Sequence, residues 1–420
     1  MADPIDLRSL RRDLHRHPEP AWCEYWTTAR IVEECERIGV DELYVGPDAI
    51  DSDARLAVPD DETLSEWAER ARAAGVDAAT IERLAGGHTG AVAVLRRGEG
   101  PTVALRVDID ALPRDESTDE DHTPAAEGFR SKTPAMHACG HDAHAAIGLG
   151  VLQRIADSDF SGTLKLLFQP AEEVIGGGQA LADSGHLDDV DALFSVHVGL
   201  DHPTGEVVAG VGEFLAVSHF EATFHGESAH AGAAPQDGRN ALLAATTATN
   251  NLYGISRHAD GRTRVNVGVV EGGTAPNIVA EEARIVCEVR GEATPLMEYM
   301  RDRADQVVDA AAAMHDCSVA IDTVGQAPSA TSDDGLIDLV VAAAEGVDGV
   351  DSIRRRAPLG GSEDATVLMN YVQNRGGTAT YVGVGTDHPG GHHTSTFDVD
   401  EESIAIGVDV LSDAIRGVQN

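Results

Sequence analysis

The sequence predicts an α/β domain, with a mostly parallel sheet flanked by helices, that is interrupted by a smaller ferredoxin-like α+β domain. Between residues 91 and 199, apolar strand-like runs alternate with helix-like segments, the pattern of βαβ units. From about residue 213 the order becomes strand, helix, strand, strand, helix, strand, which is typical of ferredoxin-like domains. The first pattern then resumes. We therefore predict a larger domain formed by 1–212 and 328–420, with 213–327 inserted into it.

Polar residues gather where the predicted strands of the larger domain end. The strand in TVALRVDIDALP is a near-continuous apolar run, which suits a strand buried on both faces of a parallel sheet. Open α/β sheets carry their sites at the carboxyl ends of such strands. In chain order the first elements are two helices within 6–38 broken at HPEP, an acidic insert at about 46–87 with a helix from Glu62 to Ala74, strands in AVAVLRRG and TVALRVDIDALP, a helix from Ala143 to Ala156, strand TLKLLFQ, helix GGQALADS and strand ALFSVHVG.

The inserted domain and the C-terminal part complete the order. The period of the pattern changes from about Phe214, and the earlier apolar pattern resumes after the inserted domain. The elements are strand SHFEATFHGE, a helix from Asn240 to Arg257, strands RVNVGVVEG and EARIVCEVRG, a helix from Met297 to Met314 and strand SVAIDTVG, followed by a helix at 335–345, strand GTATYVGVG and a closing helix from Glu401.

The composition is strongly acidic. The 420 residues include 71 Asp and Glu against 31 Lys and Arg, of which only Lys132 and Lys165 are lysines, so the formal net charge is -40. Since 42% of the residues are hydrophobic, we infer a folded protein with an acidic shell rather than a disordered chain. Such a surface repels phosphate backbones and anionic lipids, which excludes nucleic acid and membrane surfaces as expected partners. Scarce lysine beside abundant acid predicts adaptation to high salt.

The cysteines and the N-terminus predict a cytoplasmic protein. The five cysteines are an odd number without a CxxC pair, which does not fit a secreted disulfide scaffold. The first residues are polar where a signal peptide needs an apolar core, and no run approaches the ~18 apolar residues of a membrane span.

Cysteine, histidine and glutamate residues cluster at four predicted strand ends or turns. Each cluster alone has a simpler explanation: a buried thiol, a hydrogen-bonded histidine, solvated acids or a polar loop. The side chains of two adjacent acids at a strand end point in different directions, however, so that one can bind a metal while the other faces the water on that metal. Together the clusters predict a dinuclear metal site. They are Cys139 and His141 with His144 as a further candidate, Glu172 and Glu173, His197, and His392 with His393.

Nine motifs in fixed order resemble the dinuclear metal-dependent amidohydrolases of the aminoacylase and carboxypeptidase family. The resemblance is closest to the branch of auxin-conjugate and hippurate hydrolases, and the acidic insert resembles the aminobenzoyl-glutamate hydrolase group in particular. The motifs are RVDIDALP, MHACGHDAH, FQPAEE, SVHVG, GESAHAG, GTAPNIV, EVRG, GSEDAT and GHHTSTF.

The resemblance implies two divalent metal ions in each protomer and a set of ligands for them. His393 is chosen over His392 because it stands four residues before Phe397, and His392 then either is structural or supports a ligand from behind. Arg106 stands where many family members outside this branch have a metal-binding histidine. This difference supports assignment to the branch in which a cysteine is one of the metal ligands. A thiolate favours Zn²⁺, whereas the branch also uses Mn²⁺. The implied ligands are Cys139, His141, Glu173, His197 and His393.

The resemblance also implies the acids that act beside the metals. Glu172 would be the general base, taking a proton from the metal-activated water and returning it to the leaving amine. Asp108 resembles the acid that orients a ligand histidine. Loop capping is the alternative for both Asp108 and Asp110, and we expect it more for Asp110.

In the inserted domain the resemblance implies a lid and dimerisation function. His230 would reach the site of the neighbouring protomer and stabilise the oxyanion, which implies a homodimer or a heterodimer with a related chain. Asn277 and Arg290 would hold the substrate carboxylate or the scissile carbonyl, although a surface salt bridge also explains Arg290. Gly360, Gly361 and Ser362 would line the pocket.

The implied reaction is metal-dependent hydrolysis of the amide bond of N-acyl or N-aroyl amino acids, with aminobenzoyl-glutamate as the first substrate to test. A broad aminoacylase, hippurate or dipeptide hydrolase is the alternative within this class. A catalytically silent small-molecule-binding module and a thiol redox protein centred on Cys139 are alternatives from other classes.

We predict that high salt and divalent metal are required for separate reasons. Desalting with the metal retained should unfold or dissociate the protein, because the repulsion within its acidic shell is no longer screened. Chelation in molar salt should abolish turnover and leave the protein folded. Circular dichroism, light scattering and turnover, measured together, distinguish these states. A protein that keeps its fold, its mass and its activity after desalting would contradict the salt-adapted shell.

Overall fold

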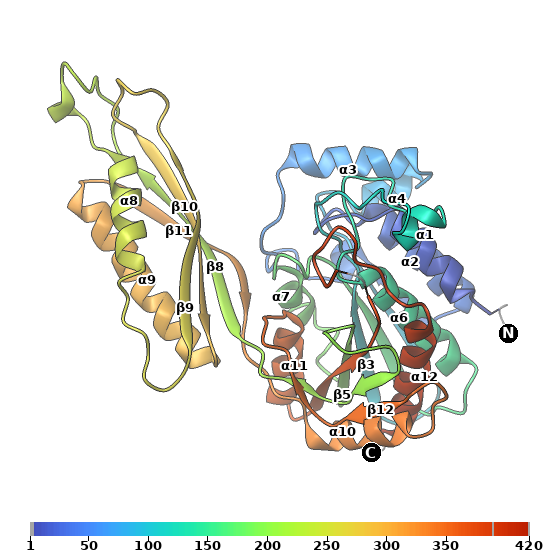
Figure 1. The fold of residues 1–420 in the computed structure, drawn as a ribbon. Helices are drawn as coiled ribbons and strands as arrows, with labels where there is room; N and C mark the ends of the chain where they lie inside the picture. Colours follow the sequence, from blue (N-terminus) through green and yellow to red (C-terminus); the bar gives the residue numbers. More distant parts are fainter. Residues whose placement is uncertain (1–3, 389, 419–420) are drawn as a thin grey trace. The chain divides into compact units, whose positions relative to one another are not determined.

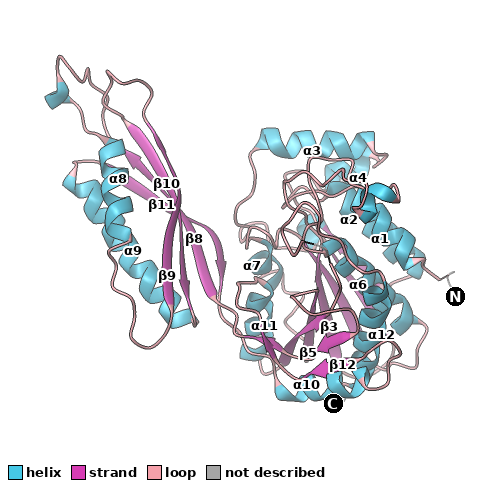
Figure 2. Ribbon diagram, in the orientation of Figure 1, coloured by secondary structure: helices cyan, strands magenta, loops and turns pink. Residues whose placement is uncertain are grey.

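The computed structural model describes residues 4–388 and 390–418, which form two compact units (Figures 1 and 2). The larger unit contains the described residues up to Glu213, Ala330–Leu359 and those from Asp364 onward. The smaller unit contains Phe214–Ser329 together with the loop Gly360–Glu363. This loop therefore belongs to the smaller unit although it lies in the C-terminal part of the chain.

The larger unit contains an eight-stranded sheet in the order β1-β2-β4-β3-β5-β14-β6-β12. The central strands β4, β3, β5 and β14 run parallel to one another, whereas β1, β2 and β6 pair antiparallel with their inner neighbours. The predicted mostly parallel sheet is thus confirmed. Its strands, with two short strands that form a separate pair, are β1 Glu42–Val45, β2 Ala91–Arg96, β3 Thr102–Asp108, β4 Thr163–Gln169, β5 Ala192–Val198, β6 Glu206–Val208, β7 Val211–Gly212, β12 Ser352–Arg354, β13 Ala357–Pro358 and β14 Thr378–Val384.

Helices cover the faces of this sheet. Helices α1 and α12 both pack against α6, and α7 packs against α11 on the other side of the sheet (Figure 1). Gly150 of α6 permits the close approach of both α1 and α12, because a Cβ there would lie 2.6 Å from Val408 of α12 and 2.9 Å from Leu7 of α1. The helices are α1 Leu7–Arg16, α2 Tyr25–Ile38, α3 Asp61–Ala73, α4 Ala78–Arg83, α5 Thr123–Ala126, α6 His141–Ala156, α7 Gly177–Ala182, α10 Asp334–Ala344, α11 Ala365–Asn374 and α12 Glu402–Gly417.

The smaller unit has an antiparallel four-stranded sheet in the order β11-β8-β10-β9, with both helices on one face (Figure 2). Phe220, Phe224, Met297 and Met300 contribute to the core between sheet and helices. The order of elements along the chain and across the sheet confirms the predicted ferredoxin-like fold. The elements are β8 Ala216–His225, α8 Ala241–Leu252, β9 Thr263–Gly272, β10 Glu282–Gly291, α9 Thr294–Met314 and β11 Ser318–Ala327.

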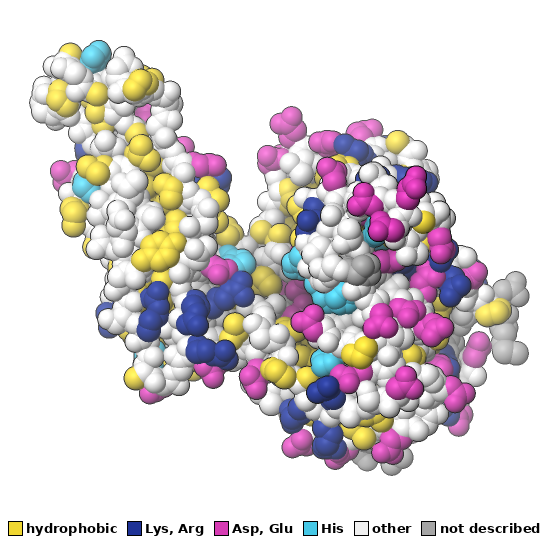
Figure 3. Space-filling view, viewed as in Figure 1, with side chains coloured by type: hydrophobic (Ala, Val, Ile, Leu, Met, Phe, Trp, Pro, Cys, Tyr) yellow, Lys and Arg dark blue, Asp and Glu magenta, His cyan; other side chains and the backbone are white. Residues whose placement is uncertain are grey.

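The surface is acidic, as the composition requires. Figure 3 shows Asp and Glu side chains spread over the visible face of the larger unit. All five cysteines are free, and four of them are buried. Within the described ranges, none of the helices is both long and apolar enough to cross a membrane.

Candidate metal centre

The predicted site residues of the larger unit lie where neighbouring parallel strands end. β3 ends at Asp108, which pairs in register with Gln169 at the end of β4, and the segment Pro170–Glu173 follows directly. His197 is the penultimate residue of β5, the other neighbour of β3. Parallel strands bring their carboxyl ends to one edge of the sheet, so Asp108, Glu172, Glu173 and His197 lie close together although they are distant in the sequence.

A left-handed glycine brings Cys139 and His141 into the same cluster. Gly140 has φ 87°, and a Cβ there would lie 2.5 Å from Val198 Cγ2. Only glycine fits this turn without strain. His141 then begins helix α6 while Cys139 stands just before it, so that both side chains face the strand ends.

Two groups of three residues together contain the five side chains predicted as ligands. Within each group the possible ligand atoms lie within 4.8 Å of one another. Cys139 belongs to both groups, and a third group joins His141 to Glu172 and Glu173, so that the predicted ligands form one continuous cluster. The groups are Cys139, His141 and His197, and Cys139, Glu173 and His393; all are buried or nearly so except His393.

The histidines at the centre direct Nε2 toward the cluster. His141 Nδ1 donates to the Asp110 carbonyl at 3.0 Å, and its buried Nε2 makes no hydrogen bond within the described part of the chain. His197 Nδ1 donates to the Val198 carbonyl at 2.7 Å, and its Nε2 lies 3.4 Å from Cys139 Sγ. Ligand histidines characteristically donate the outer N–H and coordinate through the other nitrogen.

His144 lies beside the cluster, but both of its ring nitrogens are engaged. Nε2 accepts the Val198 N–H at 2.8 Å, so the proton is on Nδ1, which donates to Asp108. Burial lowers the pKa of His144, consistent with a neutral ring. His144 therefore supports the strand end next to His197 and has no lone pair left for a metal.

Asp108 and Arg106 form a buried pair next to the cluster. Asp108 accepts from His144 and from Arg106 Nη1, the latter at 2.7 Å. Arg106 also donates to Gln169 and Asp364. Burial would raise the pKa of Asp108, but the charges of His141 and Arg106 outweigh it and hold this pKa well below its usual range. Asp108 thus orients His144. It does not accept the Nδ1–H of His141 or His197, the two predicted ligand histidines beside it.

The chemistry of the cluster fits a divalent cation. Burial, with a contribution from the charge of Glu173, raises the pKa of the Cys139 thiol to about 12, and burial holds the pKa of His197 well below its usual range. Burial also disfavours a charged His141, but the carboxylates of Asp108 and Asp110 outweigh it and raise its pKa. A cation reverses the effect on a thiol and favours neutral imidazole. Thiol, imidazole and carboxylate together form a donor set typical of zinc and related divalent metals.

The predicted residues of the smaller unit form two local pairs. His230 is exposed, and its Nδ1 accepts the N–H groups of Gly232 and Ala233 at 3.2 and 3.1 Å, which leaves a proton on Nε2. The Asn277 carbonyl accepts the Ala231 N–H at 2.9 Å, so the loops of His230 and Asn277 are adjacent.

Arg290 is associated with the loop Gly360–Glu363. Arg290 Nη1 lies 3.5 Å from Ser362 Oγ, and the Gly361 carbonyl accepts the Leu215 N–H at 2.7 Å. Arg290 Nη2 also donates to Glu288 at 3.0 Å. The salt bridge considered from the sequence is therefore present, and it leaves Arg290 beside Ser362.

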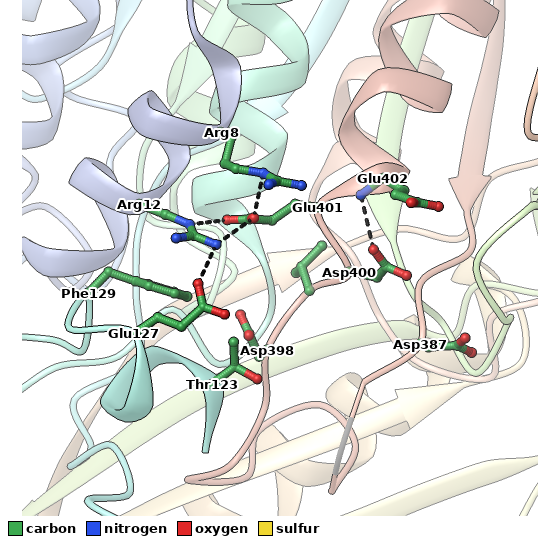
Figure 4. Close-up of a pocket in the computed structure, with 11 residues that line it drawn as sticks. Arg8, Arg12, Thr123, Glu127, Phe129, Asp387, Asp398, Asp400, Glu401 and Glu402 are labelled. Carbon is green, nitrogen blue, oxygen red and sulfur yellow. Dashed lines mark hydrogen bonds and ion pairs between the residues drawn. The ribbon is translucent and has the colours of Figure 1, made fainter. Parts of the chain in front are cut away.

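A separate cavity in the larger unit, of about 350 Å³, lies between α1 and the start of α12 (Figure 4). It contains none of the predicted site residues. Its arginines are already paired: Arg12 contacts Glu401 at 2.6 Å and Glu127 at 2.9 Å, and Arg8 contacts Glu401 at 2.8 Å. We assign it no function.

Comparisons with known proteins identify a family for the chain. A family model described as peptidase family M20/M25/M40 matches residues 104–417. The chain belongs to this family. This confirms the resemblance seen in the motifs, and the chain is a metal-dependent amidohydrolase.

Relatives in the family match almost the whole chain. The indole-3-acetyl-aspartic acid hydrolase of Enterobacter agglomerans is 44% identical over 413 residues, which are 97% of this chain and 94% of the relative. One of the subunits of the p-aminobenzoyl-glutamate hydrolase of Escherichia coli (strain K12) is 42% identical over 411 residues, with the same two coverages of 97% and 94%. The crystal structure of the aminobenzoyl-glutamate utilization protein from Klebsiella pneumoniae matches with a TM-score of 0.84 and 36% identity, covering 98% of this chain and 95% of that one.

Replacing His144 and His197 separately by Gln should distinguish a support from a ligand. His197→Gln should weaken metal binding strongly, because it removes the nitrogen that faces Cys139. His144→Gln should keep the number of bound ions and lower the free energy of unfolding by about 1–3 kcal/mol, since it disturbs buried hydrogen bonds. Metal titration and denaturant unfolding in molar salt measure the two effects. Equal loss of bound ions from both variants would contradict this assignment.

Proposed function

We propose that the chain hydrolyses the amide bond between an aromatic acyl group and an acidic amino acid, with p-aminobenzoyl-glutamate as the first substrate to test. The observation that carries this proposal is the position of Glu172. It is 6% exposed, and its carboxylate lies within 4.8 Å of the possible ligand atoms of His141 and Glu173. A buried acid beside a candidate metal site is suited to move a proton during hydrolysis.

The choice of substrate is supported by the relatives. One is named for indole-3-acetyl-aspartic acid and another for p-aminobenzoyl-glutamate. Both compounds join an aromatic acyl group to a dicarboxylic amino acid. A panel with these two compounds, hippurate, N-acetyl amino acids and dipeptides separates this specificity from that of a broad aminoacylase.

Two divalent ions per protomer, Mn²⁺ or Zn²⁺, would be held by the five clustered side chains. When bound, such ions polarise the scissile carbonyl and lower the pKa of water so that it attacks at neutral pH. The proposed ligands are Cys139, His141, Glu173, His197 and His393.

Proton transfer, stabilisation of the oxyanion and binding of the substrate are then carried out by side chains of the protein. Glu172 accepts a proton from the attacking water and donates it to the leaving nitrogen. His230 donates from Nε2 to the oxygen that becomes negative as the carbonyl is attacked. Arg290 and Asn277 hold the substrate carboxylate, and Gly361 and Ser362 line the pocket. Asp108 acts through His144 and orients it.

We further propose that the smaller unit is the lid and the dimerisation domain, and that two copies associate through β9 and α8. β9 is an edge strand of its sheet. Leu243, Tyr253, Val269 and Val270 on and around these elements are large hydrophobic residues that are exposed. An exposed apolar edge favours association with a second sheet edge. A related chain could replace the second copy, and the mass of the protein purified alone decides between the two. We place the enzyme in the cytoplasm on the basis of its five cysteines, an odd number without a CxxC pair.

Glu172→Gln and Glu173→Gln should fail in different ways. Glu172→Gln should lower kcat by about 10²- to 10⁴-fold and keep the bound metal, because it removes only the proton carrier. Glu173→Gln should weaken metal binding itself. Metal content and turnover measured on the same samples distinguish the two. Full turnover by metal-loaded Glu172→Gln would refute the mechanism.

Mixing two inactive variants should restore activity if His230 acts in the partner's site. In a symmetric dimer, random exchange of Glu172→Ala with His230→Ala gives about a quarter of wild-type activity, because half the dimers are mixed and each has one intact site. The control mixture of Glu172→Ala with Glu173→Ala stays inactive, since both defects lie in the larger unit. An inactive first mixture, with exchange of protomers verified, would contradict a site shared between copies.

A further inference from the structure

The turn that carries Glu172 and Glu173 is held by two buried carboxylates. Glu24 Oε1 accepts the Ala171 N–H at 2.9 Å, and Asp110 Oδ2 accepts the Glu173 N–H at 3.0 Å. Both acids are fully buried. Ala171 has φ 56°, in the left-handed region that residues other than glycine adopt only where the surroundings impose it. These two acceptors therefore help to hold the turn in its shape, together with backbone hydrogen bonds to the Ala171 and Glu172 carbonyls.

Asp110 also holds His141, which comes from a different segment. The Asp110 carbonyl accepts the His141 Nδ1–H at 3.0 Å, and Asp110 Oδ1 lies 3.3 Å from the same nitrogen. The opposite nitrogen of this ring, Nε2, lies 4.0 Å from Glu173 Oε1. One residue thus contacts the ring of His141 and the main chain of Glu173, and these two side chains face each other.

The backbone fixes Asp110 from both sides. The Ile109 N–H donates to the Gln169 carbonyl at 3.1 Å, and the Ala111 N–H donates to the Glu19 carbonyl at 2.8 Å. Leu112 and Met136 then exchange two further backbone hydrogen bonds. Asp110 is therefore rigid, which is the requirement for a residue that sets the position of others.

We propose that Asp110 is the positioning residue of the metal centre, which holds His141 and Glu173 at the spacing needed to reach the same ion. This inference rests on the proposed function, which assigns both residues as ligands. An imidazole that donates its outer N–H to a carboxylate or carbonyl is held in one tautomer and binds metal more strongly. Asp108, the acid expected from the sequence to do this, is engaged by His144 and Arg106 instead.

The test is the metal affinity of Asp110→Asn, measured with Zn²⁺ and with Mn²⁺ against a competing chelator in molar salt. The matched control is Asp333→Asn, whose carboxylate accepts the Ala379 N–H at 2.8 Å at the start of β14, the opposite end of that strand from the site. Both variants lose one negative charge and alter one carboxylate that accepts a backbone N–H. We expect affinity to fall by about 10- to 100-fold in Asp110→Asn and to remain at the wild-type value in the control. At saturating metal the number of bound ions should be restored.

The outcomes separate this inference from the function on which it rests. Wild-type protein that binds no divalent ion overturns both. Wild-type protein that binds ions, with equal affinity in Asp110→Asn, overturns the role of Asp110 alone. A fall of the same size in the control also overturns it, because the effect would then be general. If Asp110→Asn does not fold, Asp110→Glu is compared with Asp333→Glu, and unchanged affinity in the first again refutes the proposal.

Discussion

The left-handed turn after β4 is the constraint on which the site depends. β4 delivers the chain to Pro170, and within three residues it must present two acids in different directions. Ala171 adopts φ 56° to do so. Gly177 packs directly against the turn, since a Cβ there would lie 1.8 Å from the Pro170 carbonyl oxygen. The energetic cost of this backbone is offset by Glu24 and Asp110, whose own burial is tolerated because each accepts backbone N–H groups.

Much of this organisation follows from local patterns. The strands that form the centre of the sheet were predicted from their apolar runs, and the residues at their ends were predicted to meet because parallel strands end at a common edge. Helices α4, α5 and α11, strand β1, and the two- and three-residue strands β6, β7, β12 and β13 were not predicted. Two- and three-residue strands have no periodicity to detect, and their pairing is set by tertiary contacts.

The sequence could not show which acid supports which histidine. RVDID places Asp108 and Asp110 two apart, and both face the site, so their partners depend on distances between segments far apart in the chain. His144 was an open candidate for the same reason, because only its hydrogen bonds to Asp108 and Val198 reveal that both nitrogens are engaged. The repeated acid in this motif was the available indication that a second supporting carboxylate exists.

Several buried charges in the larger unit form ion pairs with one another. Arg11 is fully buried and lies 2.8 Å from Asp142 and 2.6 Å from Asp398. His15 bridges Asp142 and Glu116; burial and Arg11 oppose its protonation, but these two acids raise its pKa to about 9. Because Asp142 follows His141, this network ties α1 to the first turn of α6. The interior acids therefore serve positioning, whereas the net charge of -40 resides mainly at the surface.

That surface charge limits where two copies can meet. Copies that each carry -40 repel one another, and the repulsion is smallest where charged side chains are few. α8 contains no charged residue, and β9 contains only Arg264 and Glu271, in a chain of which 24% is charged. High salt shortens the screening length from about 8 Å at physiological ionic strength to about 3 Å at 1 M. The same salt that stabilises the acidic shell would therefore permit two copies to meet through this charge-poor edge. Association would then depend on salt even where the fold of each unit did not. A site that needs His230 from a second copy would depend on salt for the same reason.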